Sequence, residues 1–249
     1  MTPNPIRTVL STLRSHRVQC LLMGGQACVL YGAAEFSRDT DLALLAEPDN
    51  LARLREALAE LRAECVAVPP FSAEYLLRGH SVHFRCQHVE AAGMRVDVMS
   101  VMRGVAPFPE LWTRRTTVEL EPGEPFDLLS LPDVVAAKKT QRDRDWPMIR
   151  RLVEAHYVQN RVAPTPDQVA FWFRESRTPA LLLALATTFP ESAAQALEQR
   201  PLLEGAIAGD DARLAEALEA EEKRERELDR RYWAPLRDEL ERLRHQRQM

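Results

Sequence analysis

The first half of the chain alternates between short apolar runs and segments whose apolar residues recur at helical spacing. Short runs bounded by Gly, Pro or charged residues are typical of strands, and recurrence every three or four residues is typical of amphipathic helices. Helices are predicted over residues 5–17 and 26–33, and from Pro48 through Leu61. Strands are predicted near residues 19–24, 39–46, 65–68, 81–87, 93–100 and 116–121. This interleaving indicates an α/β (α+β) domain built on a small mixed sheet.

The pattern changes after Pro125, where nearly every following segment has helical character. Ser130, Pro132 and Asp133 are typical of a helix start, with Ser as the N-cap and Pro in the first turn. We therefore predict two domains: residues 1–125 with the mixed sheet, and residues 126–249 as an all-helical domain. Residues 209–246 combine Glu and Arg with Leu and Ala, which favours a solvated, charged C-terminal helix over a specific recognition surface.

Charge and cysteine content narrow the class of protein. The formal net charge of −4 gives no overall basic field for nucleic acid, although a local basic patch stays open. The four cysteines form no CxxC pair, which favours a reducing compartment over a disulfide framework. The N-terminus lacks an apolar core of signal-peptide length, and no apolar run approaches the roughly 18 residues of a membrane span. We expect a soluble, cytoplasmic protein with no membrane partner; the sequence does not indicate its oligomeric state.

Candidate chemistry is concentrated between Leu21 and Leu45, where a short strand, Gly24-Gly25, a short helix and an Asp-x-Asp segment follow one another. Glycines let backbone amides approach an anion closely, and the following helix directs its N-terminal amides to the same anion. Asp39 and Asp41 are two apart on a predicted strand, so both side chains leave one face. Two such carboxylates repel each other unless a cation lies between them, and oxygen-only ligands favour magnesium.

A third acid, Asp97, interrupts the apolar run of the strand predicted over residues 93–100. If that strand lies beside the one that starts at Asp39, the three carboxylates can converge and hold two metal ions. A structural acid paired with Arg95 or Arg38 is the alternative reading. His83 and Cys86 are three apart on a predicted strand and are expected to face opposite sides, so they do not predict a zinc site.

The order Gly-Gly, about a dozen residues, Asp-x-Asp and a later strand Asp resembles the nucleotidyltransferase superfamily, which has the polymerase-beta-like fold. Gly24-Gly25 match its triphosphate-binding motif, Ser37–Leu42 resembles its Asp-x-Asp segment, and Asp97 matches its third acid. The resemblance implies that Asp39, Asp41 and Asp97 hold two Mg²⁺ ions against a nucleoside triphosphate. The chain departs from the pattern at Gly25, where the family often has Ser. Arg38, beside the acids, is predicted to neutralise phosphate or to pair with Asp39.

A second resemblance lies in residues 128–149, which are similar to a helix of the bacterial branch that includes AbiEii-type toxins of toxin–antitoxin pairs. Lys138, Arg142 and Asp145 are spaced so that one helix face would present all three. In that branch the Lys contacts the nucleotide phosphates, so the resemblance implies this role for Lys138. Only three of the 33 basic residues are lysines, which mildly supports it. Lys139 lies about 100° round a helix from Lys138 and is predicted to be on the surface.

The sequence therefore predicts a metal-dependent nucleotidyltransferase that moves a nucleoside monophosphate to an acceptor hydroxyl. The acceptor stays open between RNA, protein and a small molecule, as in aminoglycoside adenylyltransferases. The alternative is a catalytically inactive binding module with the same fold. The fold alone does not give a substrate.

Overall fold

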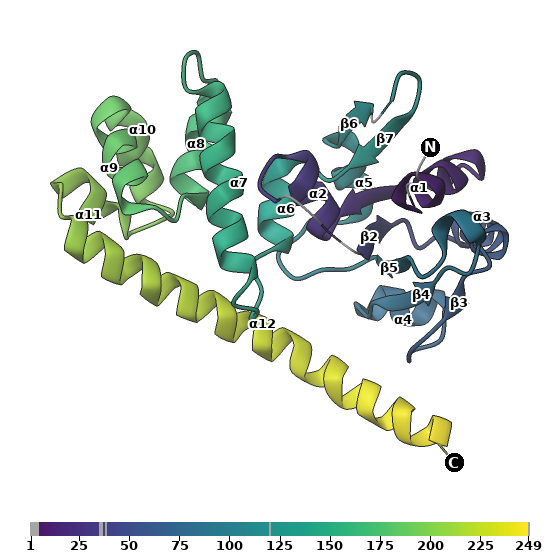
Figure 1. The fold of residues 1–249 in the computed structure, drawn as a ribbon. Coiled ribbons are helices and arrows are strands. Elements are labelled where there is room, and N and C mark those ends of the chain that lie inside the picture. The colour runs from purple at the N-terminus through teal and green to yellow at the C-terminus, as the bar shows by residue number, and fades with distance from the viewer. Residues whose placement is uncertain (1–4, 35–36, 38, 120, 249) are drawn as a thin grey trace. The chain divides into compact units, whose positions relative to one another are not determined.

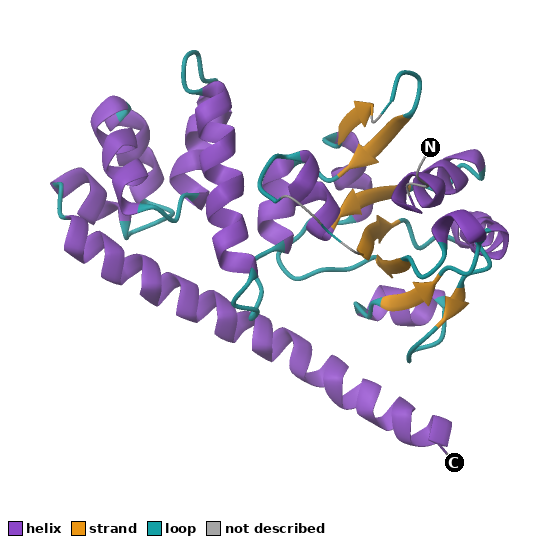
Figure 2. Cartoon of the chain, viewed as in Figure 1, coloured by secondary structure: helices purple, strands orange, loops and turns teal. Residues whose placement is uncertain are grey.

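The computed structural model describes residues 5–34, 37, 39–119 and 121–248, which form two compact units. The sheet unit consists of the described residues of Met1–Leu30, Ala34–Ala137 and Tyr232–Met249. The helical unit consists of Tyr31–Ala33 and Lys138–Arg231. All strands of the described chain lie between residues 20 and 128, and helices follow (Figure 1 and Figure 2). The expectation of a mixed α/β fold with a mostly helical C-terminal region is confirmed.

Strands and helices alternate through most of the sheet unit. Its strands are β1 (Cys20–Met23), β2 (Asp39–Leu44), β3 (Glu64–Cys65), β4 (Val82–Arg85), β5 (Arg95–Met99), β6 (Thr116–Glu119) and β7 (Pro125–Leu128). Its helices are α1 (Pro5–Ser15), α2 (Gly24–Leu30), α3 (Pro48–Glu60), α4 (Ala73–Arg78), the 3₁₀ turn η1 (Val89–Ala91), α5 (Phe108–Thr113) and α6 (Leu131–Ala137).

One mixed sheet of seven strands, in the order β3-β4-β5-β2-β1-β7-β6, is formed by the described residues. β2 pairs with β5 in parallel, and so does β1 with β7, whereas the remaining pairs are antiparallel. The strands that carry the predicted acids are therefore direct neighbours in the middle of the sheet (Figure 1).

The two faces of the central strands differ in polarity because their residues alternate. Leu42, Val96 and Val98 point to one face and are fully buried. The acids point to the opposite face. Asn50, in the first turn of α3, is buried and holds the edge of this core by donating to the carbonyl oxygens of Gln19 and Leu45 at 2.9 and 2.8 Å. The apolar face fixes the register, since a slip of one residue would bury the acids instead.

The helical unit is built from helices joined by short loops. Its elements are α7 (Asp145–Asn160), α8 (Pro166–Glu175), α9 (Pro179–Thr188), α10 (Pro190–Leu197), α11 (Leu203–Ala208) and the first part of α12 (Asp211–Gln248). Each of α8, α9 and α10 begins with Pro, which suits the first helical position because its missing N–H is not needed there. Within the described residues, no single helix is long and apolar enough to cross a membrane; α9 and α10 pass that test only together, and they are bent by 117°.

The division of the chain differs from a boundary near residue 125. β7 begins at Pro125 and pairs with β1, and α6 packs against α2, so the sheet unit continues to Ala137. α12 belongs to the helical unit up to Arg231 and to the sheet unit from Tyr232 onward. There Glu239 of α12 accepts a 2.8 Å hydrogen bond from His80, whose side chain is fully buried.

Candidate active site

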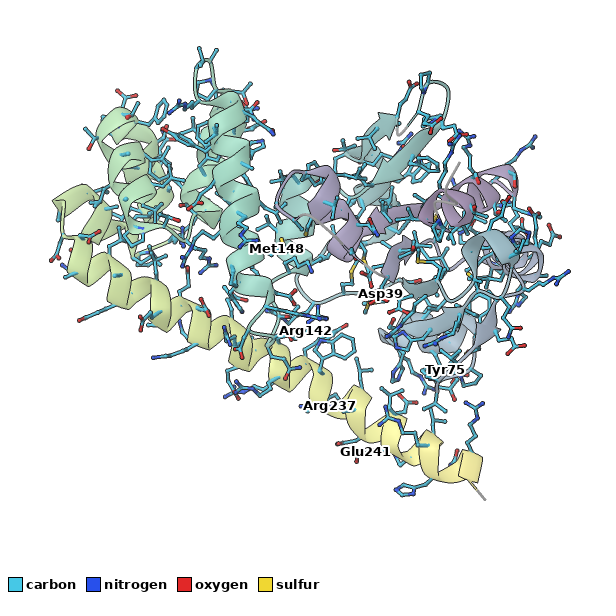
Figure 3. The ribbon with its side chains drawn as sticks, viewed as in Figure 1. Asp39, Tyr75, Arg142, Met148, Arg237 and Glu241 are labelled. Carbon is cyan, nitrogen blue, oxygen red and sulfur yellow. The ribbon has the colours of Figure 1, made fainter. Side chains whose placement is uncertain are left out.

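The parallel pairing of β2 with β5 places the predicted acids on one face of the sheet. Asp41 is opposite Asp97 in the register, and Asp39 is opposite Arg95. Paired residues on neighbouring strands share a face, and the strands lie about 4.8 Å apart. Asp39 and Asp41 share that face because they are two apart; Figure 3 labels Asp39 at the start of β2. We call Asp39, Asp41 and Asp97 the acid cluster.

Gly24 and Gly25 lie directly against the acid cluster, between the end of β1 and the start of α2. Gly24 has φ of +65°, and a β-carbon there would lie 1.9 Å from Oδ2 of Asp41. The backbone N–H of Gly25 donates a long hydrogen bond of 3.4 Å to the same oxygen. A glycine at position 24 is therefore required both by the left-handed backbone and by the approach of Asp41.

Ser37 lies beside the second glycine of the turn. A β-carbon on Gly25 would be 2.4 Å from Oγ of Ser37, so this hydroxyl occupies the space that a side chain at position 25 would need. The Ser37 hydroxyl also donates to the carbonyl oxygen of Asp39 at 3.3 Å, and the Gln26 amide donates to the carbonyl oxygen of Ser37 at 2.9 Å. The turn and the start of β2 are thus tied together.

Asp97 is the most buried member of the acid cluster, with 7% of its surface exposed. Its Oδ1 accepts a 2.8 Å hydrogen bond from Nε of Arg95. Nδ1 of His83 on β4 lies 2.8 Å from the same oxygen and 3.0 Å from a terminal nitrogen of Arg95. Nδ1 can donate to Asp97 or accept from Arg95, but not both at once. Arg95 was one of the two structural partners considered for Asp97, whereas His83 was not predicted beside it.

The guanidinium of Arg95 interacts electrostatically with all three acids and is hydrogen-bonded to Asp97. The hydrogen bond to Asp97 raises the pKa of Arg95 above its ordinary value, burial opposes that rise, and the charges of Asp97, Asp39 and Asp41 add to it. Asp97 is therefore neutralised by a side chain of its own strand, β5.

The donor set of the acid cluster is compatible with magnesium, which prefers carboxylate oxygens. Three carboxylates share a face on adjacent strands, and Asp41 packs directly against the glycine turn. Among the described residues, however, no three His, Cys, Asp or Glu side chains are grouped closely enough to hold a metal ion. Asp97 is bonded to Arg95, and Asp41 is turned to Gly25. A metal ion would therefore have to take Asp97 from Arg95.

The predicted helix that carries Lys138, Arg142 and Asp145 on one face is wrong. α6 ends at Ala137 and α7 begins at Asp145, so residues 138–144 form a loop. Lys138 Nζ donates to Oδ1 of Asp145 at 3.0 Å, and Thr140 and Arg142 donate to Oδ2 at 2.6 and 2.7 Å. Figure 3 labels Arg142 in this loop. The three residues do meet, but around a buried carboxylate at a helix start.

Lys139 is also not the surface residue that was predicted. Its Nζ lies 2.7 Å from Oε2 of Glu175, whose side chain is 7% exposed, and the Lys139 side chain itself is only 20% exposed. The loop conformation is the reason, because it turns two consecutive lysines towards two different buried carboxylates. Both therefore have a structural role within the helical unit.

Arg38, the remaining predicted nucleotide-binding residue, lies outside the described residues. The chain matches no model of a known protein family, and no curated protein matches it in sequence. The function of the protein is therefore inferred from the site itself.

Proposed function

We propose that the protein is a metal-dependent nucleotidyltransferase that transfers a nucleoside monophosphate from a nucleoside triphosphate to a hydroxyl group. The observation that supports this most is the register of β2 with β5, which pairs Asp41 with Asp97 beside the Gly24-Gly25 turn. The glycine amides, which suit an anion, and the carboxylates, which suit a cation, thus meet on neighbouring central strands of the sheet, as phosphoryl transfer requires. Neither the glycine turn nor Asp-x-Asp would support the proposal alone.

Each part of the site has a role in this reaction. Asp39 and Asp41 would hold the Mg²⁺ that the triphosphate shares, and Asp97 the one nearest the acceptor. Magnesium bound there would lower the pKa of the acceptor hydroxyl and neutralise charge on the phosphates. The amides of Gly24 and Gly25 bind the triphosphate, and releasing Gly25 from Asp41 costs little because that hydrogen bond is long. Most of the rate enhancement would come from positioning and charge neutralisation.

Ser37 is a candidate for the hydroxyl that Gly25 lacks. Its Oγ occupies the space beside Gly25 where the side chain of a serine would begin. A hydroxyl there is placed to donate to a phosphate oxygen bound by the glycine amides.

The role of Lys138 in phosphate binding stays a prediction from the resemblance to the AbiEii-type branch, and so does a toxin-like role for the protein. Its ammonium is bonded to Asp145, so phosphate binding would require a change of partner.

The acceptor, which could be RNA, protein or a small molecule, is not defined by the site. The four cysteines form no disulfide, which supports our proposal that the reaction takes place in the reducing cytoplasm.

The rival function is a binding module that holds a nucleotide without turnover. The observation that favours it is the engagement of Asp97 by Arg95 and His83, because a third acid neutralised by its own strand could be purely structural. Triphosphate binding without transfer would identify this case.

The decisive experiment uses two labels on the same triphosphate. The full-length protein is incubated with Mg²⁺, cell extract and each nucleoside triphosphate, labelled either at the α-phosphate or at the γ-phosphate. A nucleotidyltransferase transfers the α-label and not the γ-label, whereas a kinase does the reverse. Asp41→Asn should abolish transfer, and Asp49→Asn, the same chemical change at an exposed position of α3, should not. Transfer of neither label would refute the proposal.

A further inference from the structure

Arg95 contacts Asp97 of the acid cluster with a full positive charge and is itself partly open to solvent. Its side chain is 39% exposed, while that of Asp97 is 10% exposed. It stands opposite Asp39 in the register and two residues before Asp97 on the same face. A metal ion approaching Asp97 from solution therefore meets this guanidinium at the carboxylate.

We propose that Arg95 exchanges partners during the reaction: it occupies Asp97 while the site is empty, and it binds the triphosphate when metal and nucleotide arrive together. This inference rests on the proposed function, and it adds an order of binding to that function. Arg95 is a positioning residue in the empty site, because it acts by holding Asp97. It becomes a substrate-binding residue when it pairs with phosphate.

The charges of the site support this exchange. A free divalent cation is attracted to the carboxylates, but it must displace Arg95 to reach Asp97. A triphosphate that arrives with the cation carries at least three negative charges, which exceed the two positive charges of the metal ion. The displaced guanidinium then has a phosphate partner, for which its planar set of donors is well suited. The loss of the Asp97 pair is therefore offset only when the nucleotide is present.

His83 makes the exchange geometrically simple. Its Nδ1 lies 2.8 Å from Oδ1 of Asp97, so this oxygen keeps a neighbouring donor when Arg95 leaves. His83 lies directly opposite Asp97 on β4, and its Nδ1 is free to donate to this carboxylate once Arg95 has left.

The test measures metal binding without catalysis. Mn²⁺ alone is titrated into the full-length protein and free Mn²⁺ is followed by electron paramagnetic resonance. Arg95→Gln should bind Mn²⁺ alone about tenfold tighter than the wild type, because one charge-assisted hydrogen bond to Asp97 no longer competes. The experiment is repeated with Mn²⁺ and a triphosphate that cannot be cleaved between the α- and β-phosphates. The ranking of the two affinities should then reverse, and Arg95→Gln should bind Mn²⁺ and triphosphate about tenfold more weakly than the wild type.

Arg85→Gln is the matched control, since Arg85 lies opposite Arg95 on β4 and its removal changes the charge of the same face equally. Its affinities should stay within about twofold of the wild type, because an exposed charge without the Asp97 contact is well screened. Equal gains in Arg85→Gln and Arg95→Gln would overturn the proposal, since the effect would then be one of net charge. Equal Mn²⁺ affinity in Arg95→Gln and the wild type would overturn it as well.

Two further outcomes are also decisive. If Arg95→Gln does not fold, Arg95→Lys replaces it; a lysine keeps the charge but loses the planar set of donors, so a smaller gain of the same sign is expected. Wild-type affinity in Arg95→Lys would then refute the exchange.

If no variant binds Mn²⁺ even with the triphosphate, the proposed function fails together with the exchange. If Mn²⁺ and triphosphate bind but the order does not reverse, only the exchange fails.

Discussion

The glycine turn offers a sharp test of the site, because two glycines of the sheet unit share a backbone conformation but not an environment. Gly24 has φ of +65° and Gly93 has φ of +80°. A β-carbon at Gly24 would lie 1.9 Å from Oδ2 of Asp41, whereas none of the neighbouring atoms lies within 4 Å of one at Gly93. Alanine at either position would have to adopt a positive φ, but only Gly24→Ala must displace Asp41.

The expected magnitudes follow from these environments. A left-handed conformation costs a residue with a β-carbon roughly 1–2 kcal/mol, so Gly93→Ala should lower the free energy of unfolding by about that amount. Gly24→Ala should add roughly 1–3 kcal/mol for the forced movement of the carboxylate, giving a total of about 2–5 kcal/mol. Urea denaturation followed by circular dichroism measures both changes.

Binding then separates a strained fold from a damaged site. Gly24→Ala should weaken Mn²⁺-dependent triphosphate binding by at least about tenfold in calorimetric titrations, because Asp41 can no longer share a cation with Asp97. Gly93→Ala should bind as the wild type does. If Gly24→Ala folds and binds the triphosphate with unchanged affinity, the position of Asp41 against the turn is irrelevant to function and our reasoning about the site is refuted.

Three further predictions concern single carboxylates. Asp97→Asn should lower the rate of nucleotidyl transfer about a hundredfold or more with little change in triphosphate Kd, and unchanged turnover would remove Asp97 from the mechanism. Burial would raise the pKa of Asp145, but Lys138 and two neighbouring donors outweigh it, so the folded-state pKa lies below the unfolded one. The stability that this lowered pKa contributes is present above the unfolded-state pKa and is lost as the pH falls through the folded-state pKa. Asp145→Asn should therefore flatten the dependence of the unfolding free energy on pH below about pH 4. An unaltered pH profile would contradict this. Glu239→Gln replaces the charged acceptor of buried His80 and should lower the free energy of unfolding by about 1–2 kcal/mol in thermal denaturation, whereas undiminished stability would show that this pair does not hold the end of α12.

The local features of the site could be predicted from the sequence because each depends on a few neighbouring residues. Cys20–Met23 forms a strand since it is a short apolar run that stops at two glycines, and Asp39 begins a strand since an apolar run follows it. The placement of Asp39 and Asp41 on one face follows from strand alternation alone.

The partners of Asp97 could be predicted only in part. The pairing of β2 with β5, and hence of Asp41 with Asp97, was stated as a condition, because sequence periodicity does not determine which strands are neighbours. His83 was missed as a neighbour of Asp97 for the same reason: it is 14 positions away in the chain and adjacent only across two antiparallel strands. The sequence did indicate Arg95 as a partner of Asp97. Asp97 lies within an apolar run, and its nearest basic residue is Arg95, two positions away.

The prediction that Lys138, Arg142 and Asp145 share one helix face was wrong because residues 138–144 form a loop. Helical spacing does not apply to residues whose side chains hydrogen-bond within a loop. Thr140 and Asp145 are both poor residues for a helix interior, since their side chains compete for backbone and side-chain partners. In the structure Thr140 donates to Asp145, and the carbonyl oxygen of Thr140 accepts from Trp146. β7 was missed because its first residue is Pro125, which was interpreted as a domain boundary, although proline is tolerated at the start of a strand.

The sheet unit is discontinuous in sequence, since its chain leaves after Ala137 and returns at Tyr232. During synthesis on the ribosome, Glu239, which holds His80, emerges only after the entire helical unit has been translated. A nascent chain of 137 residues would contain the acid cluster and the glycine turn but not Glu239, so His80 would still lack its carboxylate partner. The contact between His80 and Glu239 therefore forms only after the chain has been translated into α12, and a polypeptide that ends before α12 would be distinguishable by its greater susceptibility to proteolysis around α4.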